Sequence, residues 1–259
     1  TRRTSANGLA RIRQRVDLLW TRGHVAGQFT CKGDDLMALK ITKAHERIDV
    51  TQLVTCIYGP PGNGKTSLAF TANKPLLIDF DGGVYRSANR GDCVQVKSWE
   101  EVQGITVEEL EPYSTVIVDT VGRALDFATA HILRNNPKAG SFGKLNQSGW
   151  GLLKSEFVKW TNTLKFLRKD VITIAHSTEK VEGDTLIERI DAVGSSKDEV
   201  YKTADMMGRL GFRDGKRVLT FSPTETAHGK NPGGFGPLEV PDFSSEPHYL
   251  AGIIQATKD

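Results

Sequence analysis

Eight consecutive residues have the types and spacing that grip a polyphosphate. Gly59-Pro60-Pro61-Gly62-Asn63-Gly64-Lys65-Thr66 fits the pattern G-x-x-x-x-G-K-[ST] of a phosphate-binding loop. Its glycines let successive backbone N–H groups point into one concavity that a side chain would block. Lys65 adds a mobile positive charge for the phosphates, and the Thr66 hydroxyl is a hard oxygen ligand for Mg²⁺. The loop therefore predicts a site for a nucleoside triphosphate and Mg²⁺.

The elements on either side of this loop decide whether the match has meaning. Leu53–Tyr58 is apolar and β-branched, which is typical of a buried strand, and Ser67 begins a stretch that reads as a helix. The helix would bring its positive end to the phosphates. Strand, glycine loop and helix is the context that the motif requires.

Other predicted buried strands also end in polar side chains. These are the strand over 76–81 with Asp79 and Asp81, the strand over 115–120 with Asp119, and the strand over 171–176 with His176. Alternating strands and helices predict an α/β fold with a mainly parallel sheet and helices on both faces. Ligands of such sheets bind at the carboxyl ends of the strands, so these side chains should meet at the nucleotide.

Each polar strand end has a candidate role and an alternative. Asp119 follows an apolar strand as a Walker B aspartate does and would serve Mg²⁺, or it caps the next helix. Asp81 would orient the attacking water, with Asp79 as its competitor on the same face. His176 would sense the γ-phosphate, or it is a satisfied structural histidine.

Three stretches of different character set the expected domain limits. Residues 1–36 are rich in arginine and are expected to be a disordered or non-native extension ahead of Met37, with a basic nucleic-acid arm as the alternative. Residues 37–240 are expected to form the core, ending in a β-hairpin around Asp214-Gly215. Residues 241–259 are expected to be an irregular tail, and Asn135–Gly149 a long mobile loop.

Composition excludes several classes of protein. The 259 residues are 38% hydrophobic and 25% charged, with a net charge of +3, as in globular proteins. No apolar run reaches the ~20 residues of a membrane helix, and the three cysteines are too scattered for a zinc site. We therefore expect a cytoplasmic protein with no membrane contact.

The order of these motifs resembles the RecA-like ATPases. The phosphate loop is followed by Leu-Ile-Asp-Phe-Asp, Val-Ile-Val-Asp-Thr and Ile-Ala-His, most like phage single-strand annealing proteins of the Sak-four type. The resemblance implies an ATPase of phage recombination in a bacterial host, with ATP and Mg²⁺ bound by the motifs above. It places the catalytic carboxylate on Asp81 and the polar switch on His176. It also implies a ring or filament of identical subunits and a phage or host single-strand-binding protein as partner.

The resemblance further implies that two segments line a channel for single-stranded DNA. Their cations and aromatic ring suit phosphate and base contacts, with solvated loops as the alternative. The candidate residues are Lys138, Phe142 and Lys144 in the first segment, and Lys180, Arg189 and Lys197 in the second. Lys230 matches part of an element that reaches a neighbour's ATP, although Pro232 stands where an arginine is expected. Tyr85 is a candidate for stacking on adenine, with an ordinary core or surface tyrosine as the alternative.

Two other functions remain open from the sequence. One is a helicase loader or ATP-dependent switch, although the Gly/Pro-rich residues after Phe221 do not suggest a helical lid domain. The other is a small-molecule or nucleotide kinase, although no arginine-rich lid segment is evident. ATP turnover stimulated by single-stranded DNA would distinguish the recombination ATPase from both.

Overall fold

The computed structural model describes residues 39, 41–194 and 196–259. The chain divides into two units, Thr1–Arg47 and Ile48–Asp259. The described residues of the first unit are exposed, and the N–H of Glu46 donates to the carbonyl of Lys43 at 2.9 Å in a turn. The arginine-rich segment predicted over residues 1–36 lies outside the described residues.

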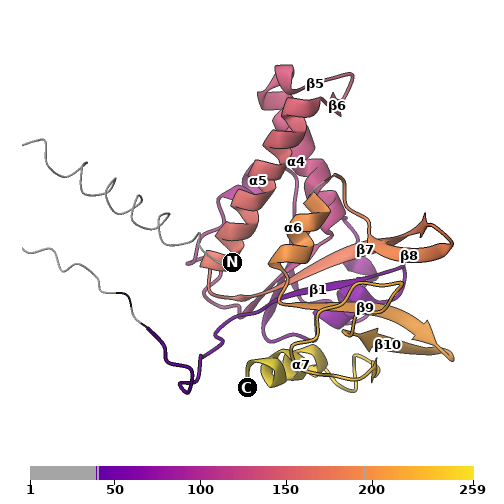
Figure 1. Ribbon diagram of the computed structural model, residues 1–259. Helices are drawn as coiled ribbons and strands as arrows, with labels where there is room; N and C mark the ends of the chain where they lie inside the picture. The colour runs from indigo at the N-terminus through magenta and orange to yellow at the C-terminus, as the bar shows by residue number, and fades with distance from the viewer. Residues whose placement is uncertain (1–38, 40, 195) are drawn as a thin grey trace, which may run out of the picture. The chain divides into compact units, whose positions relative to one another are not determined.

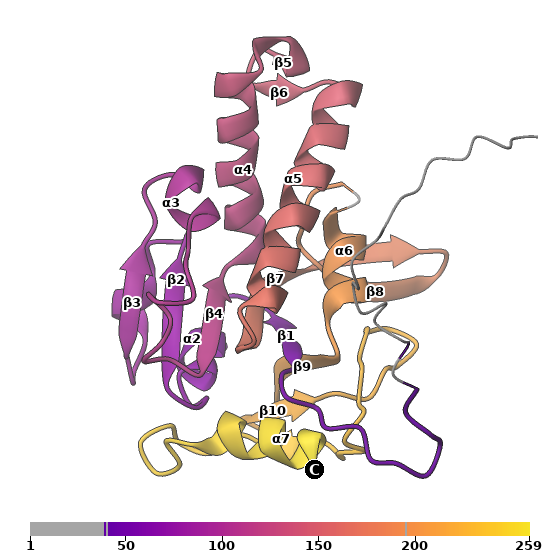
Figure 2. The same ribbon diagram turned by 90° about the vertical axis from the view of Figure 1, so that its left-hand side faces the viewer.

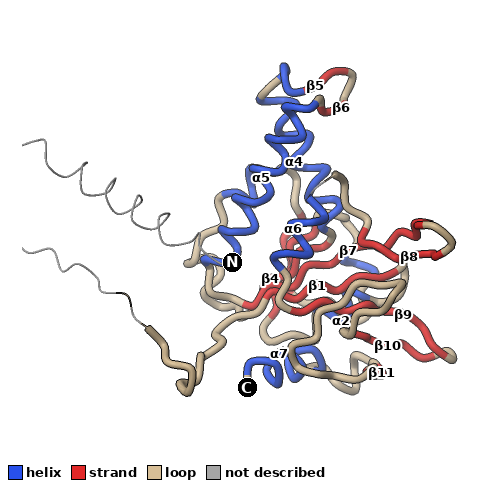
Figure 3. The backbone as a smooth tube through the Cα atoms, in the orientation of Figure 1, coloured by secondary structure: helices blue, strands red, loops and turns tan. Residues whose placement is uncertain are grey.

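The second unit is built on one mixed sheet, which contains nine strands in the described part of the chain (Figures 1 and 3). Its strands are β1 (Val54–Gly59), β2 (Pro75–Asp79), β3 (Asp92–Gln95), β4 (Thr115–Asp119), β7 (Asp170–Glu182), β8 (Thr185–Ile190), β9 (Met206–Arg213), β10 (Lys216–Thr220) and β11 (Leu238–Glu239). The order is β11-β10-β9-β1-β7-β4-β2-β3, and β8 pairs with β7. The strands from β9 to β3 are parallel, whereas β8, β10 and β11 pair antiparallel.

The register of the parallel strands brings their carboxyl ends to one edge. Asp79 lies beside Asp119, Asp119 beside Ile174, and Gly59 beside His176. Strand β7 thus separates the strand of the phosphate loop from the strand that ends in Asp119. The parallel α/β sheet and the antiparallel pair β9 and β10, which were both predicted, are confirmed.

Helices cover both faces of this sheet (Figure 2). One face carries α3 (Trp99–Gln103), α4 (Val121–Asn135), α5 (Gln147–Phe166) and α6 (Ser196–Thr203), and the other carries α2 (Lys65–Ala69) and α7 (Tyr249–Lys258). Because side chains alternate along a strand, Cys56 and Tyr58 of β1 pack under the first group, while Ile57 packs with α2 and α7. The sheet therefore has a separate apolar core on each face.

The segment Asn135–Gly149, predicted as a long mobile loop, is instead the ordered end of a helical hairpin. Helices α4 and α5 run side by side, and their far end carries η2 (Pro137–Ala139), β5 (Gly140–Ser141) and β6 (Lys144–Leu145) (Figure 2). Asn146 caps α5 by accepting the N–H of Gly149 at 3.0 Å. A Cβ at Gly149 would lie 2.1 Å from the carbonyl oxygen of Ala139, so this glycine serves close packing rather than mobility.

The second segment predicted to line the DNA channel, residues 177–197 with Lys180, Arg189 and Lys197, is also regular structure. Strand β7 continues past His176 and turns at Gly183, whose φ is 64°, into β8, and α6 follows. Much of this hairpin is exposed, so its sequence lacks the one-sided apolar alternation that signals a half-buried strand. The prediction of a loop was therefore wrong.

The tail over 241–259, predicted as irregular, contains helix α7. Leu250, Ile253 and Ile254 occur at helical spacing and are buried against the face that holds α2. The hydroxyl of Thr71 accepts the N–H of Leu250 at 3.0 Å, and its carbonyl accepts the N–H of Ala251 at 3.1 Å. The helix thus closes the core behind the phosphate loop.

Candidate functional site

The glycine-rich loop turns sharply between β1 and α2. Gly62 and Gly64 have φ values of 81° and 85°, which favour glycine. A Cβ at Gly59 would lie 2.3 Å from the carbonyl oxygen of Leu210, because β9 passes close beside the loop. The side chain of Asn63 donates to the same carbonyl at 3.1 Å. The glycines therefore allow the backbone conformation of the loop, and the hydrogen bond from Asn63 joins the loop to β9.

Lys65 begins α2 with its ammonium group folded against the loop. Its Nζ donates to the carbonyls of Gly59 at 2.9 Å and Pro60 at 2.8 Å, and lies 3.4 Å from Nδ1 of His176. Burial lowers the pKa of Lys65 to about 8, while Asp119 and Asp81 act in the opposite direction. A buried cation with neutral partners is suited to an anionic ligand such as a phosphate.

Thr66, in the first turn of α2, meets Asp119 at the end of β4. The Thr66 hydroxyl donates to Oδ2 of Asp119 at 2.7 Å. Burial raises the pKa of Asp119 to about 6, and the hydrogen bond from Thr66 opposes that shift. The alternative role of Asp119 as a helix cap is filled by Thr120, whose side chain accepts the N–H of Arg123 at the start of α4.

These two oxygen-bearing side chains fit a Mg²⁺ ion that is held jointly with a phosphate. Hydroxyl and carboxylate oxygens are the hard ligands that Mg²⁺ prefers, and they stand next to Lys65. The described residues contain no group of three or more His, Cys, Asp or Glu that would hold a metal ion alone. Phosphate oxygens and water would therefore have to complete the coordination.

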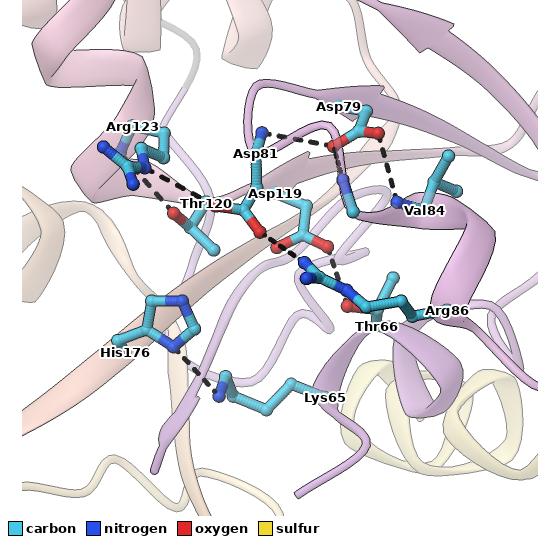
Figure 4. Close-up of polar contacts among 11 residues, drawn as sticks. Lys65, Thr66, Asp79, Asp81, Val84, Arg86, Asp119, Thr120, Arg123 and His176 are labelled. Carbon is cyan, nitrogen blue, oxygen red and sulfur yellow. Dashed lines mark hydrogen bonds and ion pairs between the residues drawn. The ribbon is translucent and has the colours of Figure 1, made fainter. Parts of the chain in front are cut away.

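Asp79 and Asp81, which the sequence left in competition, have different surroundings. Asp79 is 1% exposed, and its carboxylate accepts the N–H groups of Asp81, Gly83 and Val84 at 3.2–3.3 Å. Strand β2 ends at Asp79, so Asp81 lies in the following turn and faces the cavity (Figure 4). The lone pairs of Asp79 hold the turn, whereas those of Asp81 are directed to solvent-accessible partners.

His176 lies where β7 leaves the sheet to become a hairpin. Because an ammonium group can only donate, Nδ1 of His176 is the acceptor in its contact with Lys65. Burial lowers the pKa of His176, and the charge of Lys65 adds to the effect. A neutral histidine thus connects the phosphate loop to the β7–β8 hairpin.

These side chains surround one cavity of ≈ 430 Å³ at the carboxyl edge of the sheet. Its walls come from the glycine-rich loop, the turn after β2, and the ends of β4 and β7. The lining residues are Pro61, Gly62, Gly64, Lys65, Thr66, Ser67, Asp81, Gly83, Arg86, Ser87, Asp119, Thr120 and His176.

Some of the predicted nucleotide ligands do not line this cavity. Tyr85 is 70% exposed, and its ring centroid lies 5.5 Å from the guanidinium carbon of Arg86. The ammonium group of Lys230 donates to the carbonyl of Ala204 at 2.6 Å. Ser67 does line it, and its hydroxyl also accepts the N–H of Ala88 at 3.1 Å.

The structure adds two arginines that motif reasoning missed. Arg86 and Arg123 both form ion pairs with Asp81, and Arg86 lines the cavity (Figure 4). An arginine soon after a strand-end carboxylate is the only sequence signal for Arg86. Arg123 is brought in by the fold, because α4 starts beside the turn after β2.

The six DNA candidates do not line this cavity. Lys138, Phe142 and Lys144 lie at the far end of the α4–α5 hairpin, where Phe142 is 103% exposed. Lys180 and Arg189 lie on the β7–β8 hairpin, and Lys197 lies in α6. Thr178 pairs with Arg189 and Lys180 with Ile187, so Lys180 and Arg189 share one face of the hairpin.

Comparison with known proteins adds a family and a fold. The model of the AAA_24 family, described as an AAA domain, matches residues 51–232, and no curated protein matches the chain. Among solved structures, the RadB recombinase aligns with a TM-score of 0.40 and 17% identity over 68% of this chain and 84% of that chain. A KaiC-like protein from Pyrococcus horikoshii OT3 aligns with a TM-score of 0.41 and 11% identity over 73% and 89%.

The fold is a mainly parallel α/β sheet with helices on both faces, as the sequence predicted. The phosphate loop and the strand-end side chains Asp119 and His176 line one cavity at its carboxyl edge. Within the described residues, no helix has the length and apolar character needed to cross a membrane.

Proposed function

We propose that this chain, which belongs to the AAA domain family, binds ATP with Mg²⁺ and hydrolyses it in the cavity at the carboxyl edge of its sheet. One observation carries the proposal. The hydroxyl of Thr66 and the carboxylate of Asp119 are in contact at 2.7 Å, while Lys65 and Asp81 face the same cavity. Charge neutralisation, a metal position and a water-orienting carboxylate are the requirements of phosphoryl transfer to water.

Each side chain has a separate task in this reaction. The glycine-rich loop and Lys65 hold the phosphates, and Lys65 exchanges its carbonyl partners for phosphate oxygens. Thr66 and Asp119 would hold Mg²⁺, which neutralises phosphate charge when bound. Asp81 orients the attacking water and accepts its proton, and His176 responds to the γ-phosphate.

We further propose that single-stranded DNA is the partner that stimulates hydrolysis. The β7–β8 hairpin begins directly after His176 and places Lys180 and Arg189 on one of its faces. Helix α4 begins directly after the strand of Asp119 and leads to the exposed ring of Phe142. Cations suit DNA phosphates and an aromatic ring suits a base, so both elements could report DNA to the cavity.

A phage-type annealing protein that assembles into a ring or filament is the finer form of this proposal. Lys230, whose ammonium group is bonded within its own chain, would have to leave Ala204 to serve a neighbour's site. A loader, a switch and a kinase remain the alternatives. None of these has an observation that favours it above the ATPase.

The experiment is phosphate release with and without single-stranded DNA, beside strand annealing and a mass measurement of the assembly. We expect turnover that DNA raises, DNA affinity that falls as salt rises, and loss of turnover in Lys65→Ala. Phosphate appearing on an acceptor instead of in solution would indicate a kinase. Slow turnover without any DNA effect would indicate a switch or loader and would contradict the DNA proposal.

A further inference from the structure

The carboxylate of Asp81 is held by two guanidinium groups of its own chain (Figure 4). Nη2 of Arg86 lies 2.9 Å from Oδ2, and Nε of Arg123 lies 3.5 Å from Oδ1. Asp81 is thus engaged at both oxygens, although its proposed task is to accept a hydrogen from water. The two arginines occupy part of the acceptor capacity of this carboxylate, which has about four lone-pair sites, and they compete with that water for its oxygens.

The two arginines differ in the partners that their guanidinium groups can reach besides Asp81. Arg123 already contacts a second carboxylate, Asp126, at 3.1 Å, and it does not line the cavity. Arg86 does line the cavity, together with Lys65. Its natural new partner is therefore an anion inside the cavity, which in the proposed function is the triphosphate.

The turn that carries Arg86 is fastened at both ends. Asp79 holds its beginning through three backbone N–H groups, and Val84 is 1% exposed. The hydroxyl of Ser67, directly behind the phosphate loop, lies 3.0 Å from the hydroxyl of Ser87. Between these anchors the long side chain of Arg86 is 61% exposed and can move without displacing the turn.

Gly83 leaves the space that this guanidinium uses. A Cβ at Gly83 would lie 2.1 Å from Nη2 of Arg86 and 2.9 Å from Oδ2 of Asp81. The φ of Gly83 is −104°, so the backbone there does not require glycine. A side chain at position 83 would therefore collide with the guanidinium group of Arg86 in the position seen here.

We propose that Arg86 is a catalytic residue that acts on the nucleotide bound by its own chain. Its guanidinium group moves from Asp81 to the transferring phosphoryl group. The inference rests on the proposed ATPase function. In the step, the water oxygen bonds to the γ-phosphorus and the bond from that phosphorus to the bridging oxygen of ADP breaks. The electron pair of that bond stays on ADP, a water proton passes to Asp81 and then to solvent, and Arg86 neutralises the charge on the phosphoryl oxygens.

The same movement readies both partners of the reaction. When Arg86 leaves, Oδ2 of Asp81 loses a donor that competes with the water, and the positive charge arrives where negative charge develops. The pair of Arg86 with Asp81 is exposed, and exposed ion pairs contribute little to stability. A role in folding alone therefore does not account for this pair.

The test compares Arg86→Ala with Arg90→Ala, an exposed arginine of the same segment that does not line the cavity. At saturating ATP, Arg86→Ala should lower turnover at least about a hundredfold, while Arg90→Ala should stay within about threefold of the wild type. The second readout is binding: both variants should bind ADP like the wild type. Only Arg86→Ala should lose the extra affinity for ADP with aluminium fluoride, which mimics the transferring phosphoryl group.

Arg86→Lys provides a folded variant if Arg86→Ala unfolds, and it should also lose most of that extra affinity because lysine lacks the planar fork. Turnover of Arg86→Ala at or above the wild-type rate would overturn the inference. Lost turnover with the extra affinity for ADP and aluminium fluoride intact would overturn it too. A wild-type protein that releases no phosphate would instead overturn the proposed function, before any variant is compared.

Discussion

At the residue scale, the site depends on two aspartates that stand two positions apart. Asp79 is buried and its oxygens satisfy backbone N–H groups, so its removal should damage the turn. The carboxylate of Asp81 pairs with the exposed side chains of Arg86 and Arg123, so its removal should leave the turn intact. Asp79 thus stabilises the turn, whereas Asp81 is the carboxylate available for the proposed chemistry.

We therefore predict that two isosteric substitutions affect different properties, one the stability of the fold and the other ATP hydrolysis. Asp79→Asn should lower the free energy of unfolding by about 1–3 kcal/mol, because an amide offers one acceptor oxygen to three donors. Asp81→Asn should change it by less than about 1 kcal/mol, since its pairs are exposed. It should keep ATP binding and lose hydrolysis. Urea unfolding and phosphate release measure the two effects, and normal hydrolysis by Asp81→Asn would move the water-orienting task to another group.

At the element scale, two hairpins extend from the ends of strands β4 and β7, which reach the cavity. The β7–β8 hairpin continues from His176, and the α4–α5 hairpin continues from the strand of Asp119. The α4–α5 end is ordered by the Asn146 cap and by glycines in close contact, and it still presents Phe142 fully to solvent. An exposed ring on a well-packed support is more consistent with binding than with folding.

Phe142→Ala should therefore weaken single-stranded DNA binding by about 1–3 kcal/mol without changing ATP affinity. Its free energy of unfolding should change by less than about 0.5 kcal/mol, because the ring is exposed. Phe166→Ala at the other end of α5, where the ring is 83% exposed, is the matched control and should leave DNA binding unchanged. Fluorescence anisotropy with a labelled oligonucleotide measures both, and equal affinity of the two variants would remove the α4–α5 end from the DNA proposal.

At the scale of the whole second unit, one sheet separates two apolar cores that support different walls of the cavity. The core under α3, α4, α5 and α6 supports the turn after β2 through Phe80, which packs edge-on against Trp160 at 5.9 Å between ring centroids. The other core joins α2 to α7 and so supports the helix that carries Lys65 and Thr66. Helix α7 thus supports one wall of the proposed nucleotide site.

Leu250→Ala should test that support. Leu250 is 0% exposed, so its truncation should lower the free energy of unfolding by about 2–5 kcal/mol. Gln255→Ala, on an exposed position of the same helix, should cost less than about 0.5 kcal/mol. Urea titration gives both values, and an equally small effect of Leu250→Ala would show that α7 does not support this core.

Sequence reasoning alone predicted the elements whose patterns are local. Apolar strands such as Thr115–Asp119 are buried on both sides and read as continuous hydrophobic runs, and the glycine-rich loop has a spacing that little else produces. It failed where the pattern was weak, as in the exposed β7–β8 hairpin. It also missed α7, whose apolar residues follow a Gly/Pro-rich stretch that resembled a tail.

The sequence by itself determined that a phosphate-loop motif and several carboxylates stand at strand ends, because motif spacing and strand pattern depend on neighbouring residues. Only the tertiary structure decided which of Asp79 and Asp81 faces the cavity, since that depends on where β2 ends and which oxygens meet the turn's N–H groups. It alone brought Arg123 to Asp81, across a separation that no local pattern encodes. Contacts between distant segments arise from packing, and packing is a property of the folded chain.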